Sequence, residues 1–359
     1  MTTLKRRSIQ IIRDNQSPTG AFVASPTFSQ YGYSWLRDGM WIAHSMDAVG
    51  EHASAAAFHR WVGRTMLRHE AHINTLLGKL DRNEPVTDTD FLPTRFTLDG
   101  GFGGDDWTDF QLDGYGAWLW GVVQHCRKHR SSLWDEVRPA VRLTVRYLEA
   151  LWQMPNYDCW EEFRTEIHIA TLAALYAGFA AVQSYDPALV PEGLINRIQS
   201  YTIEQGVSPD GHFIKFLGNP NVDASLLWVA LPFNLVDVND ARFLQTVKKI
   251  EQDILRPGGG VYRYRADTYF GGGEWLLLTC WLAWVYIRLN RRGEARRLLA
   301  WVERQANASG EMPEQVTAFA LDPSYYQPWV ARWGDPACPL LWSHAMYLIV
   351  QTELDAFEK

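Results

Sequence analysis

Two short acidic segments hold the residues of this chain that are best suited to do chemistry. Residues 158–162 read DCWEE and residues 312–315 read MPEQ, and both stand beside aromatic or proline-containing sequence instead of in a solvated run of charge. Glu161 and Glu314 are so far apart in the sequence that only folding can bring them together. Two carboxylates that meet in an aromatic pocket have the chemistry needed for acid/base cleavage of a glycosidic bond.

In that chemistry the two carboxyl groups have opposite requirements. The general acid must hold a proton at neutral pH, so its pKa must be raised, and desolvation beside Trp160 would raise it. Its partner must stay ionised to activate water or to attack carbon. The alternative is structural, because Glu161 and Glu162 could simply open a helix, where the dipole favours negative charge.

Two arginine motifs could bind a polar ligand. Residues 31–38 read YGYSWLRD, and Arg37 with Asp38 could grip sugar hydroxyls through charge-assisted hydrogen bonds. They could equally pair with each other and cap a helix that starts at Gly39. Arg263 stands between two tyrosines and is either a hydroxyl donor or a surface arginine in a turn.

Other motifs give no sign of a cofactor or a metal. The glycines at 271–273 are not followed by Lys-Ser/Thr, so a P-loop is excluded, and they favour close approach of the backbone to a ligand or a neighbouring helix. No Gly-x-Ser-x-Gly or His-Glu-x-x-His motif occurs, and the four cysteines form no CxxC pair. We therefore predict no metal site. This prediction includes the two histidine pairs with helical spacing, His69 with His72 and His125 with His129.

Composition limits the class of protein. The chain is 47% hydrophobic, which supports a sizeable core, and its 17 Trp, 15 Tyr and 16 Phe could also supply platforms for sugar rings. A net charge of −7 without a basic run argues against nucleic acid as a partner. No apolar segment follows the basic N-terminus, and the apolar stretch at 275–287 is too short to span a bilayer. We expect a cytoplasmic protein with no membrane partner.

Helical periodicity dominates the chain, and the segments are of two kinds. Amphipathic segments, with one apolar stripe each, are 2–14, 51–71, 132–152, 189–205, 239–255 and 293–308. Segments that are apolar nearly all round, and therefore require burial on every face, are 35–49, 112–123, 167–182, 223–231, 275–287 and 340–350. In 132–152, Ser132 with Asp135 resembles a capping box, and Pro139 should disturb the helix.

The alternation predicts an all-α protein with two concentric layers, an (α/α)6 barrel, in one domain over 1–359. Strand signals are weak and confined to loops. The clusters of polar and aromatic residues at 31–38, 107–113, 158–162, 263–275 and 311–315 all precede inner helices. Loops that lead into inner helices open at the same end of such a barrel, so these clusters should converge on one pocket.

The residues also resemble those of glycoside hydrolase family 15, the glucoamylase family, over nearly the whole chain. Five motifs in the family's order carry the resemblance: Tyr31-x3-Trp35-x-Arg37-Asp38, Trp107-x3-Gln111-x-Asp113-Gly114, Asp158-x-Trp160-Glu161-Glu162, Arg263-x5-Tyr269-x5-Trp275, and Pro313-Glu314-Gln315 followed by Leu341-Trp342-Ser343.

The resemblance implies an (α/α)6 barrel and an inverting exo-hydrolase that releases β-glucose from a non-reducing end, with a small oligosaccharide as its substrate and no cofactor. It makes Glu161 the general acid, Glu314 the base that activates water, and Tyr31 a pocket residue near that water. Inversion places the two carboxyl groups roughly 6.5–9.5 Å apart. In this resemblance Arg37 and Asp38 hold the terminal glucose. The residues that contact the sugar are Trp35, Arg37, Asp38, Trp107, Trp160, Glu162, Arg263 and Trp275.

One departure from the family lies beside the base. Where many members read Tyr-Tyr, this chain reads Tyr269-Phe270. The missing hydroxyl could leave Tyr31 without a partner and free to join proton traffic as an auxiliary base, which would alter the pH profile. Replacing Phe270 by Tyr and measuring kcat against pH tests this hypothesis.

Two further departures bear on the substrate. Tyr31 comes about thirty residues from the start, so we expect neither the N-terminal β-sandwich nor the starch-binding module of some members. Residues 107–111 read WTDFQ instead of the WGxPQ form of starch-degrading relatives. Together with Phe270, this loop makes the chain similar to isomaltose-directed, α-1,6-cleaving members.

Several alternatives stay open on the sequence. The same chemistry could act on maltooligosaccharides or trehalose. A carbohydrate-binding α/α toroid without activity would not need both Glu161 and Glu314. A lyase or epimerase on such a barrel would usually need a His or Tyr base in place of the second carboxylate.

Overall fold

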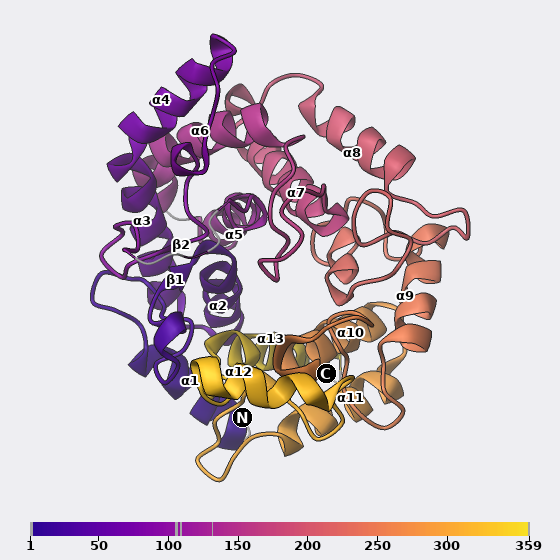
Figure 1. Cartoon of the computed structure of the whole chain (residues 1–359). Helices are drawn as coiled ribbons and strands as arrows, with labels where there is room; N and C mark the ends of the chain where they lie inside the picture. Colours follow the sequence, from indigo (N-terminus) through magenta and orange to yellow (C-terminus); the bar gives the residue numbers. More distant parts are fainter. Residues whose placement is uncertain (1–2, 105–106, 108–109, 131, 358–359) are drawn as a thin grey trace.

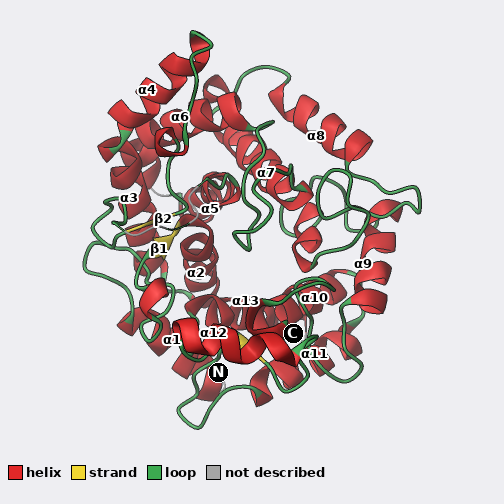
Figure 2. Ribbon diagram, viewed as in Figure 1, coloured by secondary structure: helices red, strands yellow, loops and turns green. Residues whose placement is uncertain are grey.

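Helices make up most of the protein (Figure 1, Figure 2). The structure is a computed structural model that describes residues 3–104, 107, 110–130 and 132–357. Its α-helices are α1 Thr3–Asp14, α2 Leu36–Val49, α3 His52–Arg68, α4 Glu70–Asp81, α5 Asp113–His129, α6 Leu133–Leu151, α7 Ile169–Tyr185, α8 Leu194–Gln205, α9 Ala241–Asp253, α10 Leu276–Arg288, α11 Arg292–Arg304, α12 Tyr326–Trp333 and α13 Leu341–Phe357. The 3-10 helices are η1 Ser29–Tyr31, η2 Asp88–Asp90, η3 Pro187–Leu189, η4 Ala224–Val229, η5 Tyr269–Gly271 and η6 Pro323–Tyr325.

The two predicted kinds of helix are both present. Every residue of α10 from Leu276 to Ile287 is buried, as an apolar surface on all sides requires. In α6 one stripe that includes Val137 and Leu148 is buried, and Arg142 on the opposite face is exposed. Burial therefore follows the hydrophobic pattern of each segment.

The fully apolar helices form a closed inner ring. Each inner element packs against the next in the order α2, α5, α7, η4, α10, α13, and α13 packs against α2 to close the ring. The amphipathic helices lie outside this ring in Figure 1. Helices α3, α6, α8, α9 and α11 each pack against the inner element that precedes them in the chain, and α1 packs against α13. The closest inner contact is between α5 and α7, where a Cβ on Gly116 would lie 2.7 Å from the Ala174 carbonyl oxygen.

The predicted inner helix at 223–231 was wrong in type and length. It is the short 3-10 helix η4, although its side chains are buried as expected. Asp223 precedes it and accepts the backbone N–H of Ser225, which fixes its start. Pro232 follows closely and has no N–H to continue a helix.

The predicted details of α6 were also wrong. Ser132 makes no side-chain cap, because it already has helical backbone angles itself. Pro139 does not break the helix, which runs unbroken from Leu133 to Leu151. Its ring lies on the exposed side, so the helix loses one backbone hydrogen bond and keeps its buried stripe.

Two helices were not predicted as separate elements. The segment expected at 51–71 is α3, and the chain then continues into α4. Helix α12 lies in the long connection between Glu314 and α13 and buries none of its residues. It runs across the front of the ring in Figure 1.

Two very short antiparallel ladders connect the loops that lead into inner helices. The strands are β1 Ser34–Trp35, β2 Arg95–Phe96, β3 Glu274–Trp275 and β4 Gln315–Val316. β1 pairs with β2 just before α2, and β3 pairs with β4 just before α10, with Trp275 opposite Gln315. Glu314 is thereby fixed next to Trp275. Among the described residues, no helix has the length and apolarity that crossing a membrane requires.

Candidate active site

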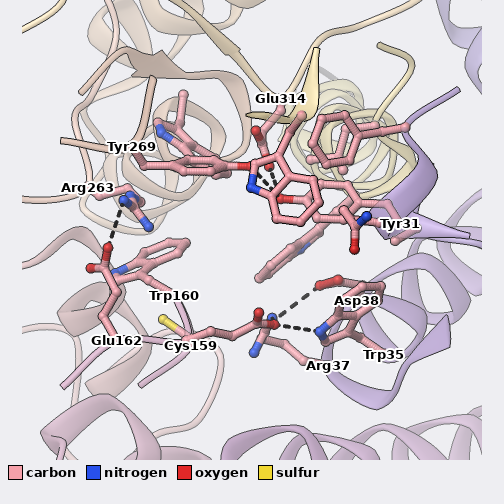
Figure 3. Close-up of a pocket in the computed structure, with 18 of the residues that line it drawn as sticks. Tyr31, Trp35, Arg37, Asp38, Cys159, Trp160, Glu162, Arg263, Tyr269 and Glu314 are labelled. Atoms are coloured by element: carbon pink, nitrogen blue, oxygen red, sulfur yellow. Dashed lines mark hydrogen bonds and ion pairs between the residues drawn. The ribbon is translucent and has the colours of Figure 1, made fainter. Parts of the chain in front are cut away.

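The five predicted clusters meet at one pocket. Its volume is about 540 Å³, and every cluster contributes at least one lining side chain. Figure 3 shows Glu162 and Arg263 on one side, Arg37 and Asp38 on the other, and Tyr31, Tyr269 and Glu314 together along a third edge. The described side chains that were predicted for the site and line the pocket are Tyr31, Trp35, Arg37, Asp38, Trp107, Trp160, Glu161, Glu162, Arg263, Tyr269, Trp275 and Glu314.

Glu161 is held in a turn of the loop between α6 and α7. Its φ of 66° is unusual for a residue other than glycine. Asp158 stabilises this turn, since its carboxylate accepts the backbone N–H groups of Trp160 and Glu162 at 3.0 and 2.9 Å. The alternative that Glu161 and Glu162 open a helix is wrong, because α7 begins only at Ile169.

The carboxyl group of Glu161 accepts one indole N–H on each oxygen. Trp35 donates to Oε1 and Trp107 donates to Oε2, both at 2.6 Å. Arg37 lies 3.8 Å from Oε1 and favours the ionised form, but burial opposes it more strongly and raises the pKa of Glu161 to about 7. A carboxyl group with this pKa can still carry a proton at neutral pH.

Glu314 has a different set of partners. Its side chain is buried, and its Oε1 accepts a hydrogen bond of 2.9 Å from the Tyr31 hydroxyl. Its Oε2 has no hydrogen-bond partner among the described residues. Burial raises the pKa of Glu314 to about 7, while the Tyr31 hydrogen bond and the charge of Arg263 favour the ionised form.

The expectation that Tyr31 lacks a partner was wrong. Its hydroxyl lies 2.9 Å from the Tyr269 hydroxyl as well as hydrogen-bonding Glu314. Phe270 turns away from this pair, and its buried ring packs near Tyr326 and Trp329 at 6.2 and 6.0 Å. Burial raises the pKa of Tyr31 well above its ordinary value, so the phenol is protonated at neutral pH and donates to Glu314.

Arg37 and Asp38 lie in the first turn of α2, which begins at Leu36, so they do not cap a helix that starts at Gly39. Arg37 is buried, and its Nη1 donates to Gln111 at 2.8 Å and lies 3.4 Å from Asp113. The two residues do pair with each other, since Arg37 Nε lies 3.5 Å from Asp38 Oδ1. Burial nevertheless raises the pKa of Asp38 to about 6. The two residues form a polar end of the pocket.

Glu162 and Arg263 form the opposite side. Arg263 is buried and pairs with Asp267, and its Nη2 also reaches Glu162 at 3.3 Å. Tyr264 donates its hydroxyl to Glu162. The alternative of a surface arginine in a turn is therefore wrong for Arg263. Trp160 and Trp275 add aromatic surface beside this pair, with ring centroids 5.7 Å apart.

A buried charge cluster beneath the catalytic loop was missed on the sequence. Lys215 lies 3.1 Å from Asp158 and 2.5 Å from Asp223. Asp223 in turn accepts the indole N–H of Trp160 at 2.9 Å. No local motif links these residues. The available signal was the single lysine in the polar segment before 223–231, because a lysine that becomes buried there needs a carboxylate partner.

Helix α12 was also missed as part of the site. Trp329, Arg332 and Trp333 line the pocket. The signal in the sequence was a pair of tryptophans four residues apart, which places them on one face of a helix. The WTDFQ loop is described only at Trp107, Phe110 and Gln111, so the contribution of Thr108 and Asp109 lies outside the described residues.

The glycines at 271–273 serve a neighbouring segment of the protein itself. Gly271 and Gly272 have φ of 84° and 72°. A Cβ on Gly272 would lie 2.5 Å from the Asp267 carbonyl oxygen, and one on Gly273 would lie 2.8 Å from that of Val316. They permit close backbone packing and form no cradle for phosphate.

The histidines gather elsewhere, at the carboxyl ends of α2 and α5. His125 and His129 both lie near the carboxylate of Asp47, at 2.8 and 3.1 Å, and His52 lies 3.3 Å from it. Asp47, His52 and His129 could in principle offer three ligand atoms, but hydrogen bonds alone account for the arrangement. The absence of a metal stays a prediction.

The arrangement has the parts of an acid/base pair in a sugar-binding pocket. Half-buried Glu161 and buried Glu314, both with raised pKa values, stand among tryptophans and tyrosines, flanked by arginine–carboxylate pairs that suit hydroxyl groups. Each glutamate has its own environment, with indole donors on Glu161 and a phenol on Glu314.

Comparison with known proteins agrees with this chemistry. The family model described as "Glycosyl hydrolases family 15" matches residues 3–302. The chain is 42% identical to an isomaltose glucohydrolase from Kribbella flavida, over 98% of this chain and 92% of that protein. It is 27% identical to a trehalase from Thermoplasma acidophilum, over 83% of this chain and 55% of the trehalase.

Solved structures give the same result. A glycosidase in complex with glucose superposes with a TM-score of 0.94 at 41% identity, covering 98% of this chain and 96% of that one. A bacterial glucoamylase complexed with acarbose shares the fold, with a TM-score of 0.75 at 19% identity over 99% of this chain and 56% of the glucoamylase. On the family match and the 42% identical relative, the chain belongs to glycoside hydrolase family 15 and is a glycoside hydrolase.

Proposed function

We propose that this protein is an inverting exo-α-glucosidase that releases β-glucose from the non-reducing end of isomaltose and short isomalto-oligosaccharides. The observation that carries the proposal is the pair Glu161 and Glu314, one half-buried and one buried, which line one pocket with pKa values raised to about 7 and with different hydrogen-bond partners. Identity to an isomaltose glucohydrolase supports the linkage.

In this mechanism Glu161 protonates the glycosidic oxygen that leaves. Glu314 removes a proton from water, which attacks the anomeric carbon from the opposite face of the sugar. We assign Oε2 of Glu314 to that water, because this oxygen is buried and makes no hydrogen bond to a described residue. Tyr31 donates to Oε1 and keeps the carboxylate oriented, so we assign it a positioning role in place of the auxiliary base.

The remaining residues hold the sugar. Arg37 and Asp38 bind hydroxyl groups of the terminal glucose, since both line the pocket as an adjacent cation and carboxylate. Arg263 and Glu162 bind hydroxyls at the other side of the pocket. The closed ring of inner elements supports an (α/α)6 barrel, with η4 in the place of one inner helix, as the single catalytic domain. The cytoplasmic location stays a prediction.

The anomer of the released glucose tests this proposal. Proton NMR during hydrolysis of isomaltose, maltose, panose and trehalose should show β-glucose first, and fastest release from isomaltose. β-Glucose from trehalose alone would support the trehalase alternative, which the 27% identical relative keeps in view. Panose decides the stereochemistry, because its leaving group is a disaccharide and the only glucose released comes from the non-reducing end; initial α-glucose from panose would contradict inversion.

The pH profile depends on the two carboxyl groups in opposite senses. Activity is lost above the pKa of Glu161, because the acid is then deprotonated, and below the pKa of Glu314, because the base is then protonated. With both pKa values raised to about 7, we expect a narrow bell-shaped profile of kcat/KM near neutrality. The two apparent pKa values of this profile are properties of Glu161 and Glu314 together, because the two carboxyl groups titrate as a coupled pair.

Trp107→Phe is expected to move the alkaline limb to higher pH by about one unit. The Trp107 indole N–H stabilises the ionised form of Glu161, so its loss raises the pKa of that acid. The measurement is kcat/KM for isomaltose from pH 4 to 10. An alkaline limb that stays in place, or moves to lower pH, would show that Glu161 does not control it. Trp152→Phe, a tryptophan outside the pocket, is the control.

A further inference from the structure

Helix α12 has an unusual position for an aromatic helix. It contains Tyr326, Trp329 and Trp333, yet none of its residues is buried. Trp329, Arg332 and Trp333 nevertheless line the pocket. A helix that leaves tryptophans accessible at the rim of a polar, aromatic pocket has surface suited to a ligand that enters there.

Backbone hydrogen bonds hold the segment that contains α12 at both ends, first to residues 271–272 and then to the proposed base. Before the helix, the backbone N–H groups of Leu321 and Asp322 donate to the Gly272 and Gly271 carbonyls at 3.0 and 2.9 Å. After the helix, the Ala337 carbonyl accepts the backbone N–H of Glu314 at 2.8 Å. The helix is therefore positioned by the same loops that position Glu314.

Trp329, the first residue of α12 that lines the pocket, also contacts the pair Tyr31 and Tyr269 through Tyr269. The Trp329 ring lies edge-on to Tyr269, with centroids 4.9 Å apart, and the Tyr269 hydroxyl lies 2.9 Å from that of Tyr31. Trp329 thus packs against Tyr269, and both side chains line the pocket. Trp333 and Arg332 continue this lining toward the solvent, since Arg332 is exposed and Trp333 is partly exposed.

The order of residues along the pocket gives the direction of a bound sugar. Arg37 and Asp38, which are 5% and 7% exposed, close the inner end and hold the terminal glucose in the proposed function. The leaving sugar must then extend toward the more exposed side of the pocket, which includes the α12 side chains that line it. Arg332 is exposed, and Trp329 and Trp333 are partly exposed.

The side chains of α12 have the chemistry that a pyranose needs. Tryptophan faces stack on the CH surface of a sugar ring with little loss of conformational freedom. The Arg332 guanidinium lies over Trp333 at 4.7 Å and near Trp329 at 5.9 Å, which orients it between the two rings. Within the described residues Arg332 makes no ion pair, so its N–H donors are available to hydroxyl groups.

We propose that Trp329, Arg332 and Trp333 form the binding site of the leaving sugar, and that α12 contributes to substrate recognition by contacting that sugar. The proposal rests on the proposed function, because it needs a terminal glucose held at Arg37 and Asp38. It assigns part of substrate recognition to a helix that takes no part in proton transfer.

The test compares two substrates that share the terminal glucose and differ in the leaving group. The leaving group of isomaltose is glucose. The leaving group of α-glucosyl fluoride is fluoride, which cannot contact α12. Arg332→Ala and Trp333→Ala should each lower kcat/KM for isomaltose about tenfold or more, as expected for a lost stacking or hydrogen-bonding contact. The loss for α-glucosyl fluoride should be much smaller, about twofold at most.

Gln327→Ala provides the matched control. Gln327 is an exposed residue of the same helix and does not line the pocket, so its loss should leave the ratio of the two kcat/KM values as in the wild type. Because Arg332 and Gln327 are both exposed, neither substitution is expected to unfold the protein, and circular dichroism checks this.

Two outcomes would overturn the assignment. Equal losses on both substrates would mean that α12 supports Glu314 through Tyr269 without binding the leaving sugar. No loss on isomaltose would mean that the leaving sugar lies elsewhere. Failure of the proposed function looks different, because the wild-type protein would then not hydrolyse isomaltose, whatever its rate on α-glucosyl fluoride.

Discussion

Glu161→Gln and Glu314→Gln are each expected to lower the rate of β-glucose release from isomaltose about 10²- to 10⁴-fold, the usual contribution of one general acid or base. The amide keeps the shape of the side chain and cannot exchange the proton. In Glu161→Gln the leaving oxygen receives no proton, and in Glu314→Gln water keeps its own. Initial rates at a saturating concentration of isomaltose measure the effect.

Stability should change in the opposite direction. The pKa of Glu314 is raised by burial from 4.5 to about 7, so the folded protein holds this proton more tightly than the unfolded chain. Ionisation of Glu314 therefore costs stability as pH rises from 4.5 through 7, by about 1.4 kcal/mol for each unit of the shift. Glu314→Gln removes that cost, and its free energy of unfolding at pH 8 should exceed that of the wild type by roughly 1–3 kcal/mol.

This pair of measurements separates catalysis from folding. Loss of activity with retained or increased stability is the expected result for both variants. Glu192→Gln, at an exposed position of the chain, serves as the control and should change neither quantity. Near-wild-type turnover in either catalytic variant would refute the assignment of that glutamate.

Much of the fold could be predicted from hydrophobic pattern alone. Helices such as α10 and α6 are long and strongly patterned, so burial all round or along one stripe decides their place. The errors lie where local chemistry overrides the pattern. η4 is cut short by Asp223 and Pro232, and the proline in α6 is tolerated because it faces solvent.

The candidate site divides in the same way. Residues that stand in local motifs, such as Glu161, Arg37 and Glu314, were predicted and do line one pocket. Residues that act through distant partners were missed, because no motif joins Lys215 to Asp158 across 57 positions. The partner of Tyr31 was misjudged for a related reason, since a sequence does not show that Tyr269 turns toward it and Phe270 away.

Lys215→Met is expected to destabilise the fold by about 3–5 kcal/mol, the usual result of removing one member of a buried ion pair. Lys215 is 5% exposed and lies between Asp158 and Asp223, so its loss leaves two carboxylates buried without their cation. The lysine holds the pKa of Asp158 below its ordinary value. Without it that pKa rises, and stability in the variant should fall further as pH rises and Asp158 ionises.

The same substitution should reach the active site through Asp158 and Asp223. Asp158 accepts the backbone N–H groups on either side of Glu161, and Asp223 accepts the indole N–H of Trp160. Chemical denaturation and kcat/KM for isomaltose are the two measurements, with Lys248→Met on the exposed face of α9 as the control. Adding Asp223→Asn to Lys215→Met removes one stranded charge and should recover part of the lost stability. A variant as stable as the wild type would show that the cluster contributes no net stability, and unchanged kinetics would show that it does not position the catalytic turn.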